Sequence, residues 1–212
     1  MTETNENATV AARISEAIAE KIIAGTLKPD MPLRQDHIAR EFNSSHVPVR
    51  EAFRQLEAQY LVVALPRRGV RVAPLDATSI REISEMRAAL EVVALRHAAP
   101  RLASADFARI ELALIEGENA ETLQEFETAN RVFHQALVTP CKMPRLLASL
   151  DGLQRANSRL VFAMARSSGW RPRSNQDHRL SVQALRARNL EQASNLLARH
   201  IQTIERLGVP AS

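Results

Sequence analysis

Apolar residues recur at helical spacing from Pro74 to the end of the chain, and this period limits the fold more than any other feature. Only residues 61–65 and 70–72 read as short apolar strands, with a turn between them. Aromatic residues are 4% of the chain, and Leu, Ala, Ile and Val carry the apolar content, which favours helices. The sequence therefore predicts a mainly α fold with one small hairpin. The helical period is interrupted near Pro100, Gly117, Pro140, Gly169-Trp170 and Asn189.

The change from a mixed pattern to a purely helical one falls near residues 73–76 and divides the chain into two predicted domains. Residues 10–74 combine three helices with the hairpin. Residues 77–208 are predicted to be helical throughout, with loops at the breaks. Residues 1–9 are polar and are predicted to form a disordered tail.

Composition excludes several classes of protein. The single cysteine, Cys141, excludes an internal disulfide, and no stretch approaches the length of a membrane span. Residues 1–9 lack the apolar core of a signal peptide, so we expect a cytoplasmic protein without a membrane partner. The net charge of +4 does not by itself indicate a nucleic-acid partner. Of the 28 basic residues only Lys21, Lys28 and Lys142 are lysines, and arginine suits bidentate contacts to phosphate, guanine or carboxylate.

The stretch SSHVPVREAFRQLE, Ser44 to Glu57, contains a proline inside a helical pattern. Ser45 is a good N-cap because its hydroxyl can accept a free backbone N–H of the first turn. Pro48 then lies in that turn, where its missing N–H has no intrahelical partner to lose, so it marks a helix start. The helix has an apolar face of Val49, Phe53, Leu56 and Tyr60, and a polar face of His46, Arg50, Arg54 and Glu57.

A short helix, a tight turn and a helix with outward polar residues near its N-terminus together form the helix-turn-helix plan. The second helix of that plan enters the major groove, where arginine on guanine is the commonest specific contact. The hairpin tip that follows is basic and resembles a wing. Either feature alone is better explained as solvated surface, but their order and spacing favour DNA binding. The candidate DNA-binding residues are Ser45, His46, Arg50, Arg54, Arg67, Arg68 and Gly69.

Three histidines in the helical half, His134, His178 and His200, fall on lines of otherwise apolar residues. His178 and His200 lie at equal distances along the sequence from the break at Asn189. If the helices before and after this break form an antiparallel hairpin, the two histidines should face each other. Asn130 precedes His134 by one helical turn on the same face. A lone inward histidine is usually a core residue hydrogen-bonded to a neighbour. Here the agreement of spacing and facing favours a cation site of three imidazoles and one oxygen.

Arg87 interrupts the apolar line of Ile83, Leu90 and Ala94 on the first long helix of the second half. A buried, unpaired guanidinium is costly, so Arg87 needs a partner. That partner is either a protein carboxylate such as Glu91 or the carboxylate of a small ligand. A structural ion pair or a side chain that extends its head to solvent is an equally good explanation.

Residues 10–74 resemble the DNA-binding domain of the GntR family of bacterial transcription regulators, whose recognition helix typically reads S-R-x-P-V-R-E-A-L-x-x-L-E. The similarity includes Ile22-x-x-Gly25-x-Leu27-x-Pro29 and the Arg-Gly wing. His46 stands where the family usually has arginine, whereas Arg50 keeps its place. The resemblance implies a winged helix-turn-helix that binds double-stranded DNA.

Residues 77–208 resemble the FCD ligand-binding domain of the FadR subfamily, which implies an antiparallel all-helical bundle. The metal site of that domain typically follows D-x-x-x-H on one helix, with a histidine on each of two later helices. Its effectors are usually small carboxylates held by the metal and by an arginine, which here would be Arg87. Asn130 stands in place of the usual aspartate, and zinc or nickel would suit three histidines. The matching metal positions are Asn130, His134, His178 and His200.

Three functions compete at this point. The leading hypothesis is a transcription regulator, expected to be a repressor, that reads a pseudo-palindromic operator as a homodimer and responds to a small carboxylate. The second is a metal-dependent hydrolase or lyase that uses the three-histidine site, although no carboxylate falls beside the inward histidines as an evident general base. The third is a protein-interaction module, which steeply salt-dependent binding to DNA would exclude.

Overall fold

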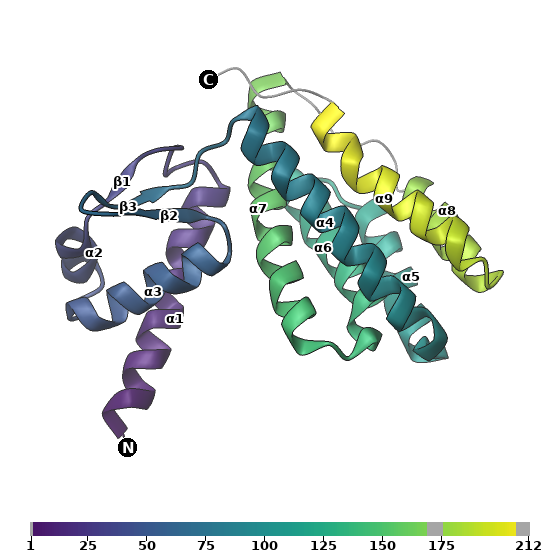
Figure 1. The fold of residues 1–212 in the computed structure, drawn as a ribbon, viewed down its shortest axis with the longest axis horizontal. Helices are drawn as coiled ribbons and strands as arrows, with labels where there is room; N and C mark the ends of the chain where they lie inside the picture. The colour runs from purple at the N-terminus through teal and green to yellow at the C-terminus, as the bar shows by residue number, and fades with distance from the viewer. Residues whose placement is uncertain (1, 169–175, 207–212) are drawn as a thin grey trace.

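The computed structural model describes residues 2–168 and 176–206, with side chains for residues 9–166 and 176–203. A small N-terminal domain that contains a sheet is joined to a larger bundle of helices (Figure 1). The prediction of a mainly α chain, with a winged helix-turn-helix before an all-helical bundle, is confirmed. The predicted break at Gly169-Trp170 and residues 207–208 lie outside the described residues.

Helices α1 to α3 and an antiparallel sheet of order β1-β3-β2 make up the N-terminal domain. In the hairpin, Val62 pairs with Val72 and Leu65 with Gly69. Strand β1, which pairs with β3, was not predicted, because two residues are too few to show an alternating pattern. The elements are α1 (Thr2–Ile23), β1 (Pro32–Leu33), α2 (Gln35–Glu41), α3 (His46–Ala58), β2 (Val62–Leu65) and β3 (Gly69–Val72).

Helix α1 begins earlier than the sequence predicted. It extends from Thr2, so the tail predicted to be disordered over residues 1–9 is helical from its second residue onward. An established helix gains one backbone hydrogen bond for each residue added, so a polar segment can extend a helix that packing has already established.

The core of the small domain follows the predicted apolar face of α3. Val49, Phe53 and Leu56 are at most 4% exposed and pack in one cluster with the isoleucines of α1. Ala52 is fully buried, which lets α1 pack closely on α3. Tyr60, the last residue of that predicted face, lies beyond the helix end and is half-buried. The three isoleucines of α1 are Ile14, Ile18 and Ile22.

The second domain is helical in all its described elements. Its first helix, α4, is capped by Asp76, whose carboxylate accepts a hydrogen bond from the Ser79 backbone N–H at 2.8 Å. The predicted breaks at Pro100 and Pro140 are short 3-10 turns, η1 and η2. No helix in the described part of the chain has the length and apolar character to cross a membrane. The elements are α4 (Ala77–Ala98), η1 (Ala99–Arg101), α5 (Ser104–Glu118), α6 (Leu123–Val138), η2 (Thr139–Cys141), α7 (Pro144–Ser168), α8 (Gln176–Arg186) and α9 (Leu190–Arg206).

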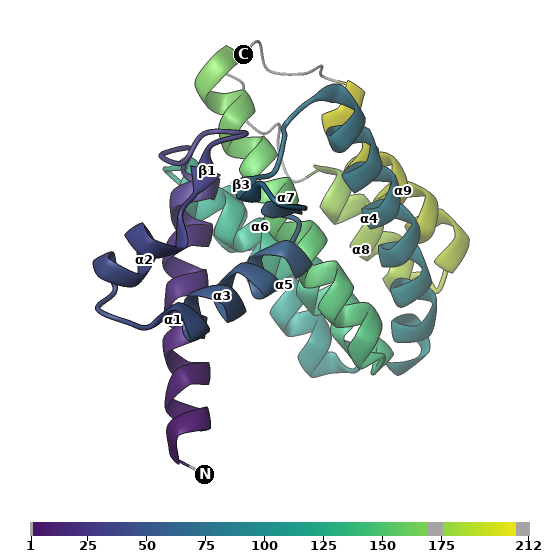
Figure 2. The same ribbon diagram turned by 60° about the vertical axis from the view of Figure 1, so that its left-hand side comes forward.

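Helix α7 lies between the two domains (Figures 1 and 2). The buried guanidinium of Arg159 donates to the backbone carbonyls of Ala73 at 2.7 Å and Pro74 at 3.3 Å, in the segment that links β3 to α4. Burial lowers the pKa of Arg159 to about 10, so the side chain stays charged at neutral pH. Arg159 therefore fixes the interdomain linker to α7 through charge-assisted hydrogen bonds.

Two further arginines of α7 contact helix α1. Arg155 Nη1 lies 2.8 Å from Glu16 Oε2, and Arg166 Nη1 donates to the carbonyl of Ala24 at 3.0 Å. The Arg166 contact satisfies one of the carbonyls left without an intrahelical partner at the end of α1. One side of α7 is thus attached to the N-terminal domain and its linker at three separate places along its length.

Helix α7 packs against the C-terminal end of α3 at Gly152, which is buried. A Cβ added there would lie 2.7 Å from the Ala58 carbonyl oxygen and 3.1 Å from Gln59 Cα. Backbone atoms cannot rotate away, so we expect Gly152→Ala to separate α7 from α3 and cost about 1–3 kcal/mol, despite a gain in helix propensity of about 1 kcal/mol. Urea unfolding measures the change, with the exposed Ser149→Ala as control. Equal stability of the two variants would contradict the tight contact.

Candidate functional site

The N-terminus of α3 differs in one respect from the predicted cap. Ser45 is the N-cap residue, with φ −79° and ψ 172°, but its side chain makes no capping hydrogen bond. A capping hydroxyl accepts from the second or third helical residue, and the third residue of α3 is Pro48, which has no N–H. Proline therefore marks the helix start, as predicted, and at the same time removes a donor that Ser45 would use.

The polar face of α3 is exposed as its spacing predicts. His46, Arg50 and Arg54 all lie on the surface. His46 Nε2 is 3.3 Å from Asp36 Oδ1 of α2, and Arg54 Nη1 is 3.3 Å from Glu51 Oε2. Both pairs are solvent-exposed and contribute little to stability, so these side chains are free to exchange partners.

The hairpin tip places Arg67 and Arg68 on the surface, next to Gly69. Arg67 and Gly69 have positive φ, 61° and 79°, as the tight connection between β2 and β3 requires. An added Cβ at Gly69 would meet nothing within 4 Å. Glycine is therefore needed here for its backbone conformation, and it leaves the tip without bulk beside two cations.

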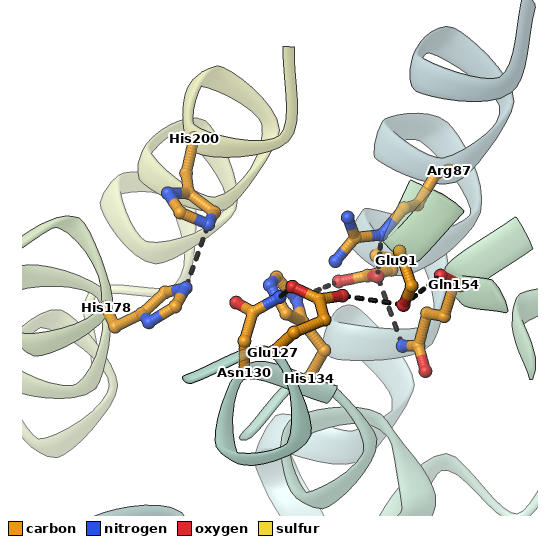
Figure 3. A network of polar contacts seen from close by, with 9 residues as sticks. Arg87, Glu91, Glu127, Asn130, His134, Gln154, His178 and His200 are labelled. Carbon is orange, nitrogen blue, oxygen red and sulfur yellow. Dashed lines mark hydrogen bonds and ion pairs between the residues drawn. The ribbon is translucent and has the colours of Figure 1, made fainter. Parts of the chain in front are cut away.

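The three predicted inward histidines come together in the helical domain (Figure 3). His134 of α6, His178 of α8 and His200 of α9 place their ligand atoms within 4.8 Å of one another. His178 Nε2 lies 2.8 Å from His200 Nε2, so the facing predicted across the hairpin is confirmed. Asp177 Oδ2 lies 3.6 Å from the other ring nitrogen of His200 and can orient that ring.

His134 carries a buried nitrogen that has no hydrogen-bond partner. Its Nδ1 lies 2.7 Å from Glu91 Oε2, which assigns the proton to Nδ1 and leaves the Nε2 lone pair bare. His134 is fully buried, and Nε2 is without a partner in the structure. A carboxylate on one ring nitrogen and a free lone pair on the other is the arrangement of a metal-bound histidine, so the residues present fit a divalent cation.

The partner that Arg87 requires is Glu91, one turn along α4. Arg87 Nε lies 2.8 Å from Glu91 Oε1, and both side chains are at most 3% exposed. Gln154 of α7 also donates to Glu91 Oε1, at 3.3 Å. Burial would raise the pKa of Glu91, but His134 and Arg87 outweigh it and hold that pKa well below its usual range. Glu91 therefore contacts a histidine directly, which the sequence did not reveal, and it orients that histidine from the side away from Nε2.

Asn130 lies on the same side of α6 as His134 and is half-buried (Figure 3). Its Nδ2 donates to Glu127 Oε2 at 3.2 Å, and the Ser158 hydroxyl of α7 lies 2.6 Å from Glu127 Oε1. Glu127 is 3% exposed, and burial raises its pKa, although Ser158 and Arg87 oppose the rise. Glu127 was not predicted, although its spacing places it on the α6 face of Asn130 and His134. Gln154 and Ser158 lie on α7 and were not predicted, because only the fold brings them to Glu91 and Glu127.

The electrostatic environment keeps the buried histidines neutral. Burial lowers the pKa of His134 to about 4, although Glu91 partly opposes the change. Burial, together with His200 and His134, lowers the pKa of His178 well below its ordinary value. Neutral imidazole is the form that binds metal ions, so both rings are in the binding form at pH 7.

A winged helix-turn-helix with arginines on the exposed face of its second helix, joined to a bundle that encloses histidines, defines a two-domain DNA-binding regulator. Residues 10–72 match the family described as "Bacterial regulatory proteins, gntR family", and residues 82–203 match the "FCD domain". The chain belongs to the gntR family of bacterial regulatory proteins and carries the FCD domain of its FadR-type members.

Relatives agree with this assignment along most of the chain. The "Probable D-xylose utilization operon transcriptional repressor" of Paenarthrobacter nicotinovorans is 31% identical over 195 residues, which cover 91% of this chain and 86% of the relative. The "HTH-type transcriptional repressor GlaR" of Escherichia coli is 28% identical and covers 86% and 88%. The solved structure of Escherichia coli McbR/YncC has the same fold, with a TM-score of 0.76 at 21% identity over 93% and 96%. The chain is a DNA-binding transcription regulator and not an enzyme.

The lowered pKa of His134 makes the stability of the metal-free protein depend on pH. Between about pH 6.5 and about pH 4 the unfolded chain binds a proton that folded His134 does not, so the free energy of unfolding falls as pH is lowered. We expect His134→Gln to reduce this loss, and the exposed His37→Gln to leave it unchanged. Urea unfolding with a chelator at about pH 7 and about pH 5 measures both. Identical pH dependence in the two variants would contradict the neutral, buried state of His134.

Proposed function

We propose that this protein is a metabolite-responsive transcription repressor that binds its operator as a homodimer. The observation that carries the proposal is the position of α7. One side of this helix contacts the histidine site, through Gln154 to Glu91 and Ser158 to Glu127, and another side holds the DNA-binding domain. A change in the site can therefore reach the recognition helix through one rigid element.

The DNA contacts are assigned to α3 and the wing. Arg50 and Arg54 read base edges in the major groove, and Ser45 and His46 contact the backbone at its edge. The basic tip at residues 67–69 enters the neighbouring minor groove or contacts its phosphates. Two such domains related by twofold symmetry read half-sites about one DNA turn apart. The relatives named as repressors support repression, and a regulator that binds a chromosomal operator would act in the cytoplasm.

The effector site is assigned to the histidines and Arg87. His134, His178 and His200 hold a divalent ion, zinc or nickel, and the Asn130 oxygen adds a ligand. A bound cation supplies positive charge for a carboxylate. Arg87 uses Nε for Glu91, which leaves its terminal amino groups for a small carboxylate effector beside the ion.

The coupling between the two sites follows from the same helix. A ligand that draws Arg87 or Glu127 toward the cation changes the hydrogen bonds these residues make with neighbours, including those from α7. The arginines of α7 carry that shift to α1 and to the linker at residues 73–74. Effector and operator must then alter each other's affinity by the same factor, because the coupling is a single free energy.

Loss of Arg50 should weaken sequence-specific DNA binding. We expect Arg50→Ala to reduce affinity for duplex from the region upstream of the protein's own gene by about 1–3 kcal/mol, with little effect on random duplex. Arg145→Ala, an exposed arginine at the start of α7, serves as the matched control. Fluorescence anisotropy at several salt concentrations measures the affinity for each of the two duplexes, and the wild-type affinity should fall steeply with salt. Equal, weak binding to both duplexes by the wild type would contradict the regulator's assigned recognition surface.

Metal and effector should act together. Nickel or zinc at about 100 times its dissociation constant should stabilise chelator-treated protein by about 2.7 kcal/mol. His178→Ala should abolish this gain, and the surface variant His37→Ala should retain it. With the metal bound, a panel of small hydroxy- and dicarboxylates is then tested for release of the operator duplex. A carboxylate that occupies the site while operator affinity stays constant would rule out the coupling.

A further inference from the structure

We propose that Glu127 is a positioning residue that turns the Asn130 amide so that its oxygen, and not its nitrogen, faces the histidines. The inference rests on the proposed metal site and specifies how that site tolerates asparagine. Asn130 Nδ2 lies 3.2 Å from Glu127 Oε2, one helical turn earlier on α6. In Figure 3 the amide nitrogen faces Glu127 and the oxygen points to the side where His178 lies.

The chemistry of an amide makes this contact decisive. An asparagine side chain presents a donor at one end and an acceptor at the other, and only the oxygen can bind a cation. Rotation by half a turn about the last side-chain bond exchanges the two ends, so a free asparagine spends part of its time with NH2 toward the ion. The Glu127 oxygen that faces Asn130 accepts a hydrogen bond from the amide nitrogen, so Glu127 favours the orientation in which the nitrogen faces it.

Glu127 is itself fixed in place. The Ser158 hydroxyl of α7 lies 2.6 Å from Glu127 Oε1, and both side chains are at most 3% exposed. The two oxygens of Glu127 therefore contact two different helices, α7 through Ser158 and its own helix through Asn130. A side chain held at both oxygens has little freedom, which is what orienting a neighbour within a site requires.

Glu127 does not join the histidines as a ligand in this structure. Among the described residues, the group of candidate ligand atoms within 4.8 Å of one another comprises His134, His178 and His200 alone. The carboxylate acts on the site through Asn130, as an outer partner of a ligand, and such partners commonly change metal affinity about 10–100-fold.

The same contact explains why asparagine suits this position. An aspartate in place of Asn130 would bring a second carboxylate to hydrogen-bond distance from Glu127, in a buried setting where like charges repel strongly. An aspartate at position 130 binds cations better than asparagine does, but repulsion from Glu127 would oppose its charged form. The effect of residue 130 on metal binding must therefore depend on residue 127, which is a coupling that a purely structural Glu127 would not produce.

A double-mutant cycle with Co2+ as the probe tests this dependence. Binding is followed by the visible absorption of the bound cobalt in wild type, Glu127→Gln, Asn130→Asp and the double variant, with the exposed Glu116→Gln as control. Glutamine can donate as well as accept, so we expect Glu127→Gln to weaken cobalt binding about tenfold. Asn130→Asp alone should bind no more tightly than wild type. In the double variant the introduced amide can donate to the introduced carboxylate, so this protein should bind about tenfold more tightly than either single variant.

The outcomes separate the two levels of the proposal. Circular dichroism and thermal unfolding confirm that each variant is folded before its affinity is compared. Additive effects, or tight cobalt binding by Asn130→Asp in the presence of Glu127, would overturn the positioning role and leave the metal site intact. If the wild-type protein shows no absorption of bound cobalt and so behaves like His178→Ala, the metal site and the role of Glu127 are both overturned.

Discussion

The carboxylate of Glu91 is the contact on which the interior of the helical domain depends. It accepts from Arg87 on its own helix at 2.8 Å, from Gln154 of α7 at 3.3 Å, and lies 2.7 Å from His134 of α6. Removal of Glu91 would leave the buried guanidinium of Arg87 without its partner, and breaking such a buried ion pair destabilises a protein by about 3–5 kcal/mol. It would also free the His134 ring to rotate. One side chain thus sets the spacing of three helices and the direction of the His134 lone pair.

Helix α7 connects that contact to the DNA-binding domain. Residues 154 and 158 of α7 face the buried site, while Arg155 and Arg159, each one position further along, face the other domain. Adjacent positions on a helix point about 100° apart, so a single helix can contact two partners at once. The linker carbonyls held by Arg159 connect β3 to α4, the helix that carries Arg87 and Glu91. The site and the DNA-binding domain are therefore joined twice: covalently by the linker from β3 to α4, and by the side-chain contacts of α7.

Sequence patterns within single segments predicted many features of the fold and of the site. Features that depend on contacts between segments could not be predicted in this way. The start of α3 just before Pro48, its buried face and the facing of His178 and His200 follow from the pattern along one helix or one hairpin. The polar residues of α7 gave no comparable signal. Gln154, Ser158 and Arg159 are buried because helices pack on both sides of α7. The hydroxyl cap expected of Ser45 failed for a local reason, the absence of an N–H on Pro48.

The density of buried charge is an argument about function in its own right. Arg87, Glu91 and Glu127 are each at most 3% exposed, in a bundle whose main core cluster consists largely of aliphatic side chains. Apolar residues of similar volume commonly stabilise a core as well as a buried ion pair does, or better. Stability alone therefore gives no reason to keep these groups together. The proposed ligand site would give such a reason, because a divalent cation would supply the partner that His134 Nε2 lacks in the structure.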